Sequence, residues 1–165
     1  MRSGGWNLRT VDLSGIPLHP QIVHFPIALI TVSFLIDLVG VITGSKKWTQ
    51  FGGILLSLAV FSSLIALLTG QSSEQSLKPM SDILHEAVEE HEGMATRVFF
   101  FFLIIAVLRG WLQLKGIFNS WKQWGYVILA GAGVILILRV GQLGGTLVYK
   151  HGAGVQTGES TQISE

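Results

Sequence analysis

Four long apolar stretches separated by polar segments dominate the pattern of this chain. They cover residues 22–42, 51–69, 94–111 and 126–148. Each is close to the roughly 20 residues that a helix needs to cross a ~30 Å hydrocarbon core. The apolar positions do not alternate with a period of two, and lipid requires every backbone polar group to be bonded inside the segment. The pattern therefore predicts an all-α integral membrane bundle of four transmembrane helices.

Polar segments flank the predicted bundle. We expect a polar N-terminal tail over residues 1–17, a four-helix transmembrane domain over residues 18–155, and a disordered tail over residues 156–165. No apolar segment with a cleavage site precedes the first span, so we expect no cleaved signal peptide. An even number of spans returns the chain to its starting side, which predicts both termini on the same side of the membrane.

The charges in the connecting segments predict an orientation. The two shorter connections, residues 43–50 and 112–125, carry lysines and no acidic residue, and Arg109 lies at the same face. Since Lys and Arg in short loops favour the cytoplasm, we expect both termini and the acidic connection 70–93 to be periplasmic. We therefore expect a multi-pass protein of the cytoplasmic membrane. An interfacial aromatic belt at the cytoplasmic face would consist of Trp48, Trp111, Trp121 and Trp124.

Composition supports a membrane location and narrows the chemistry. The chain is 49% hydrophobic and 13% charged, with a mean hydropathy of +0.55, whereas soluble domains carry about 25% charged residues. The absence of cysteine excludes disulfides, iron–sulfur clusters and covalent c-type haem. A formal net charge of +1 gives no basis for nucleic-acid binding. We expect contact with the lipid bilayer, and any metal would be bound by His, Asp, Glu or Met.

All five histidines are predicted at one membrane face. His19 and His24 open the first span, His85 and His91 precede the third, and His151 follows the fourth. An imidazole at the edge of hydrocarbon is costly unless it faces protein, water, a metal or a cofactor. We therefore consider these histidines as candidate ligands of a shared site. The alternative is that interfacial loops simply collect polar residues.

Two prolines shape the start of the first span. Pro20 suits a first helical turn, which makes His19 the expected cap. Pro26 removes the hydrogen bond to the Ile22 carbonyl and predicts a local widening beside His24.

The segment from His85 to Glu92 predicts a short helix that leads into the third span. It differs from a zinc-protease motif because the residue four positions after His85 is Glu89. His85 and Glu89 are expected on one helix face, whereas His91 is not on that face.

Two charges are predicted inside the spans, Asp37 and Arg139. The helical rise places Asp37 roughly 22 Å and Arg139 roughly 13 Å from the histidine-bearing side, a gap that a long arginine partly bridges. One interpretation is a proton path or an anion contact at Arg139, and the other is an interhelical ion pair or hydrogen bond.

The end of the fourth span is rich in glycine. Gly141 and Gly145 form a small-xxx-small pair that predicts a close helix approach. Glycine beside His151 allows a backbone path that returns this histidine over the bundle, together with Tyr149.

Three features of the chain resemble the domain of unknown function 2231 family of small four-helix bacterial membrane proteins. They are the motif HPQIVHFPIAL near the start, a single histidine just before the third span, and the motif GGTLVYKHGAGV near the end. The resemblance extends from His19 to Val155. It implies that the family's recurring histidines fall on His19, His24, His91 and His151, and its acidic residue on Asp37. His85 is outside the recognised pattern. The family name implies no activity, although related domains occur beside electron-transfer modules.

The leading hypothesis is a b-type haem, or another histidine-ligated metal centre, near the periplasmic face that serves electron transfer. His24 would pair with His91 or His151 as axial ligands. Arg97, Lys150 or Arg139 would meet the propionates, with Tyr149 nearby. A redox protein or a membrane complex would then be the partner.

Two alternatives remain open. The first is a cofactor-free membrane subunit or small permease in which Asp37 and Arg139 line a polar path. The second is a structural anchor that joins a larger complex, or a homo-oligomer, through its glycine-rich helix. A stand-alone enzyme is disfavoured, because no serine or cysteine nucleophile lies in a recognisable setting.

Overall fold

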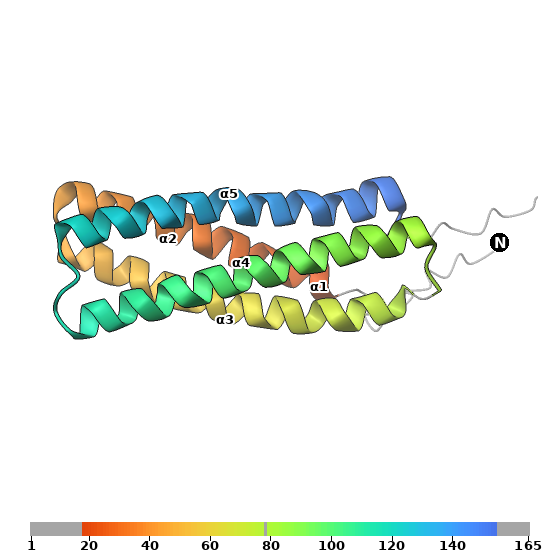
Figure 1. The fold of residues 1–165 in the computed structure, drawn as a ribbon, viewed down its shortest axis with the longest axis horizontal. Helices are drawn as coiled ribbons and strands as arrows, with labels where there is room; N and C mark the ends of the chain where they lie inside the picture. The colour runs from red at the N-terminus through yellow and green to blue at the C-terminus, as the bar shows by residue number, and fades with distance from the viewer. Residues whose placement is uncertain (1–17, 78, 155–165) are drawn as a thin grey trace, which may run out of the picture.

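The computed structural model describes residues 18–77 and 79–154, which fold into helices joined by short connections (Figure 1). The described part contains no strand. The helices are α1 (Leu18–Ile22), α2 (His24–Thr43), α3 (Lys46–Ser76), α4 (Asp82–Leu114) and α5 (Ser120–His151). Among the described residues, four segments are long and apolar enough to cross a membrane, and α1 and α2 together form the first of them. The prediction of an all-α bundle of four membrane helices is confirmed.

The four long helices pack as an antiparallel bundle (Figure 1). Contacts join α2 with α3, α3 with α4, α4 with α5, and α5 with α2, so α2 lies diagonally across from α4. The α2–α3 and α4–α5 connections lie at one end, which we call the hairpin end. The start of α1, the α3–α4 connection and the end of α5 lie at the other, which we call the histidine end.

The helices extend well beyond the apolar stretches. The expected long connection over residues 70–93 is mostly helical, because α3 continues to Ser76 and α4 begins at Asp82. The side chain of Ser81 accepts a hydrogen bond from the Leu84 amide at 3.3 Å and caps α4. His85 therefore lies inside α4, where its Nε2 is 3.4 Å from Oε1 of Glu89. The shared face of these two residues is confirmed.

The first span is interrupted at Val23, between α1 and α2. Pro26 lies buried in the first turn of α2 and has no N–H for the Ile22 carbonyl, which accounts for the break. Val23 keeps φ −61° and ψ −21°, so the chain continues in nearly helical conformation. His19 lies inside α1 rather than capping it from outside.

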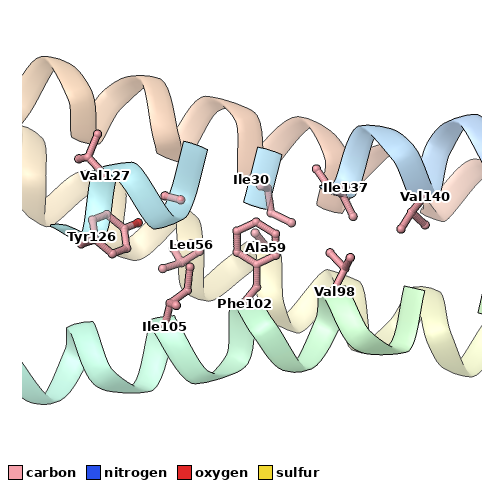
Figure 2. Packing of buried hydrophobic residues seen from close by; sticks show 11 residues of the cluster. Ile30, Leu56, Ala59, Val98, Phe102, Ile105, Tyr126, Val127, Ile137 and Val140 are labelled. Carbon is pink, nitrogen blue, oxygen red and sulfur yellow. The ribbon is translucent and has the colours of Figure 1, made fainter. Parts of the chain in front are cut away.

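Apolar side chains from all four long helices fill the bundle centre (Figure 2). Phe102 packs so tightly on Gly133 that a Cβ there would lie 2.5 Å from its ring. Within the described residues, a Cβ at Gly141 would meet the Ile27 side chain at 3.4 Å, and no backbone atom of another helix lies within 4 Å of a Cβ at Gly141 or Gly145. Large apolar side chains also cover the outer surface, as expected for helices that face lipid.

Candidate functional site

A buried ion pair joins α2 to α4 near the hairpin end. Asp37 is 1% exposed and Arg109 is 2% exposed. Arg109 Nη2 donates to Asp37 Oδ1 at 2.7 Å, and Nη1 donates to Oδ2. Because both carboxylate oxygens are engaged by one guanidinium, the pair is bidentate and geometrically specific. It crosses the bundle along the α2–α4 diagonal.

The two remaining helices complete this network. The Tyr126 hydroxyl of α5 donates to Asp37 Oδ2 at 2.9 Å, and Arg109 Nη2 also donates to the Thr49 carbonyl of α3. The guanidinium carbon lies 4.4 Å from the centroid of the Tyr126 ring. Arg109 Nε is the one buried side-chain polar atom of this network that has no hydrogen-bond partner among the described residues. The network therefore ties all four long helices together.

Glycine in α3 makes room for the buried carboxylate. A Cβ at Gly52 would lie 2.5 Å from the carboxyl carbon of Asp37. The Ser33 hydroxyl donates to the Gly52 carbonyl at 2.8 Å and holds α2 against this glycine. Since burying charge is tolerated only when the charge is paired and hydrogen-bonded, these contacts explain how Asp37 is accommodated.

The predicted contact between Asp37 and Arg139 is wrong. Arg139 lies exposed on α5, where Nη1 donates to Gln142 Oε1 at 2.7 Å. Arg109, expected at the same membrane face as the lysines of the connecting segments, is the actual partner. Buried positions of α4 recur at intervals of three and four residues and include Arg109 in the same stripe, namely Val98, Phe102, Ile105 and Arg109. The spacing places Arg109 on the same helix face as these core residues, but the sequence does not mark that face as the inward one, because the span is apolar on every side.

Two imidazoles face one another near the histidine end. The ring centroids of His19 in α1 and His91 in α4 are 6.4 Å apart, and the ring planes are 78° apart. Both side chains are half-buried. The backbones of α1 and α4 are not in contact, so the two rings reach toward each other across the same diagonal as the ion pair.

A hydrogen bond orients His19. Its Nδ1 lies 3.3 Å from Thr69 Oγ1. The Thr69 hydroxyl donates to the carbonyls of Ile65 and Ala66, each at 3.0 Å. Because the single hydroxyl proton is already used, we infer that His19 donates from Nδ1 to Thr69. In that tautomer, Nε2 of His19 keeps an open lone pair.

Glycines in the neighbouring helices seat both rings. A Cβ at Gly70 in α3 would lie 3.2 Å from Cε1 of His19, and a Cβ at Gly144 in α5 would lie 3.2 Å from Cε1 of His91. Within the described part of the chain, Nδ1 of His91 is buried and has no hydrogen-bond partner. Nδ1 of His91 therefore has a hydrogen-bonding capacity that no described residue uses.

The other predicted ligands do not join this pair. His24 is exposed on α2, and Tyr149 is 91% exposed. His151 ends α5, about 10 Å along the helix beyond Gly144. Arg97 is exposed on α4, where its Nε donates to the Gly93 carbonyl at 3.0 Å. The residues that the structure describes contain no group of three or more His, Asp or Glu placed to hold a metal ion.

The comparison with known families agrees with this architecture. A family model described as "Predicted membrane protein (DUF2231)" matches residues 15–157. The chain belongs to the DUF2231 family. This confirms the resemblance in the end motifs and supports contact with the lipid bilayer through several spans. No curated protein and no solved structure matches the chain.

The match to the DUF2231 family includes both polar clusters. At the hairpin end, opposite charges satisfy one another, which suits a structural tie. At the histidine end, two imidazole rings face each other, and neutral imidazole is a common metal ligand. The histidine pair is therefore the better candidate for ligand binding.

Proposed function

We propose that this membrane protein binds a metal centre through His19 and His91, either the iron of a b-type haem or a single transition-metal ion, and that it serves electron transfer. The observation that carries the proposal is the pair of facing imidazoles, with ring centroids 6.4 Å apart. Metal–imidazole bonds are about 2 Å long, so two rings that share one metal have centroids roughly 6 Å apart. The observed separation fits that geometry.

The hydrogen bond from His19 to Thr69 supports the proposal. Histidines that bind metals usually donate their second ring N–H to an oxygen, which sets the tautomer and the ring orientation. Thr69 Oγ1, 3.3 Å from Nδ1 of His19, occupies that place. Nε2 of His19 would then be the ligating atom.

The number of available donors favours haem over a bare ion. A transition-metal ion in a protein commonly takes three or four side-chain ligands, and no such group occurs among the residues described. A haem supplies its own equatorial nitrogens and needs only axial ligands, which His and similar side chains provide. Two axial imidazoles leave no open coordination position for a substrate, which suits electron transfer better than catalysis.

Purification followed by visible spectroscopy and metal analysis tests this function. We expect about one metal or haem per chain, with a Soret band if the centre is haem. His19→Ala and His91→Ala should each lose it. His24→Ala and His85→Ala are matched controls, because both histidines are exposed at the same end of the bundle. These controls should retain the centre.

Three results would overturn the proposal. The first is negligible metal and no Soret band in protein produced with haem and metal supplementation. The second is equal content in the wild type, His19→Ala and His91→Ala. The third is a loss caused by His24→Ala alone, which would restore the pairing expected from the sequence.

A cofactor-free subunit or small permease is the second candidate. The buried Arg109, whose Nε has no partner among the described residues, favours it, because ionisable residues inside membrane spans mark substrate and ion pathways. In this version Arg109, rather than Arg139, works with Asp37. Ion flux into liposomes that contain the purified protein, lost in Asp37→Asn while metal content stays negligible, would favour this candidate.

A further inference from the structure

A cavity of about 300 Å³ lies between α4 and α5 at the hairpin end. Arg109, Ile105 and Tyr126 are its buried lining residues. The rim is exposed, with Leu108 at 50% and Leu129 at 47%. Because these rim residues lie on the outer surface of two membrane-spanning helices, the cavity opens sideways toward lipid rather than into the bundle centre.

The charge of the cavity is concentrated at one end. The charge of Arg109 is met by Asp37. Lys122, which also lines the cavity, donates from Nζ to the Ile117 carbonyl at 3.0 Å and lies 5.5 Å from the Trp121 ring. The first turn of α5 contains no acidic residue. The end of the cavity near Lys122 is therefore positive, and the rest of its wall is largely apolar.

The aromatic residues place this positive end at the membrane boundary. Trp111, Trp121 and Trp124 are 51%, 73% and 45% exposed around the hairpin end, and exposed tryptophan is typical of the headgroup level. Leu129 lies seven positions after Lys122 in the sequence, which corresponds to roughly 10 Å along the helix. Lys122 therefore lies at headgroup level, and the apolar part of the cavity lies at acyl-chain level.

We propose that the cavity between α4 and α5 binds an anionic phospholipid, with part of an acyl chain in the cavity and the headgroup phosphate at Lys122. Basic pockets between membrane helices recognise anionic headgroups, and the apolar wall suits a hydrocarbon chain. The shape explains why an amphiphile fits, and the position of Lys122 explains the preference for negative charge. This site is independent of the histidine pair.

Two glycines allow a direct test of the cavity. Gly125 lines it, and a Cβ at Gly125 meets no described atom within 4 Å. Gly125→Leu therefore fills the cavity without an initial clash. Gly110 has the same free space around its Cβ but does not line the cavity, so Gly110→Leu is the matched control. For the headgroup, Lys122→Gln is compared with Lys46→Gln at the exposed start of α3.

Native mass spectrometry of each purified variant, mixed with equal amounts of phosphatidylglycerol and phosphatidylcholine, measures the bound lipid. We expect one retained phosphatidylglycerol on the wild type and about a fivefold preference over phosphatidylcholine, as one lysine near the headgroups provides. Lys122→Gln should lose the preference, and Gly125→Leu should lose the retained lipid. Both control variants should behave like the wild type.

The proposal would be overturned if the wild type retained phosphatidylglycerol and phosphatidylcholine equally. It would also be overturned if the Gly125→Leu variant kept its native helix content and still retained as much lipid as the wild type. A dimer peak that Gly125→Leu abolishes would show that a second copy of the chain occupies the cavity, and it would overturn the proposal too. Lys122→Gln keeps the test decisive if Gly125→Leu does not fold.

Discussion

The two ends of the bundle are built alike but satisfy their polar groups differently. At each end, side chains reach across the diagonal to α4, and a glycine in a neighbouring helix makes room for them. At the hairpin end, Asp37 and Arg109 neutralise one another. At the histidine end, His19 and His91 are of the same kind, and a buried ring nitrogen of His91 is unpaired among the described residues.

This difference separates a structural tie from a candidate ligand site. A buried charge is expensive unless it is paired, so each member of the hairpin-end network requires the others. A neutral imidazole carries a smaller desolvation penalty, so the bundle tolerates an unpaired ring nitrogen there. Mutations at the hairpin end should therefore change stability, and mutations at the histidine end should change ligand binding.

The largest effect is expected from Asp37→Ala. It leaves the Arg109 guanidinium buried without its counter-charge, which should lower the free energy of unfolding by about 3 to 5 kcal/mol. Unfolding in mixed detergent micelles measures the change. Asp37→Leu combined with Arg109→Met should recover most of the loss, and Arg139→Ala is the exposed control. A small loss for Asp37→Ala would remove the contrast between the two ends.

Gly52→Ala should have the next largest effect. Its Cβ would lie 2.5 Å from the carboxyl carbon of Asp37, and such overpacking costs about 2 kcal/mol. Gly125→Ala is the control, because its Cβ meets open space among the described residues and alanine favours helix. The same unfolding assay applies. A Gly52→Ala variant as stable as the wild type would show that the carboxylate can move without breaking its contacts.

A moderate effect is expected for Tyr126→Phe. It removes the hydrogen bond from the hydroxyl to Asp37 Oδ2 and keeps the ring against the guanidinium, so the loss should be about 1.5 kcal/mol. In the Asp37→Leu, Arg109→Met background, Tyr126→Phe should cost less. An equal cost in both backgrounds would mean that the hydroxyl does not act through Asp37.

The smallest change in stability is expected for His91→Leu. In protein stripped of metal and haem, the substitution removes a buried unpaired nitrogen, so the free energy of unfolding should fall by less than about 1 kcal/mol or should rise. The same variant should bind no metal centre. A loss as large as that of Asp37→Ala in stripped protein would make the histidine pair a structural tie.

The hydrophobic and polar pattern of the sequence predicted where many of the relevant residues lie, but the contacts expected between them were wrong. The sequence places Asp37 inside a span, His19 and His91 at one end, and His85 and Glu89 on a shared helix face. It does not single out Arg109, because a basic residue near the end of an apolar stretch resembles an interfacial anchor. It does not single out Tyr126 or Thr69, because neither differs from the residues around it. The predictions of a redox partner, a second copy and a periplasmic histidine end stay predictions.

The sequence by itself determined the four spans and their helical form, because the length of an apolar stretch and the need to bond the backbone in lipid are local properties. Only the tertiary structure decided that Asp37 faces Arg109 and that His19 rather than His24 faces His91. Helices in lipid are apolar on every side, so their pattern does not say which face turns inward. Packing against neighbouring helices sets that rotation, and with it the contacts of both ends.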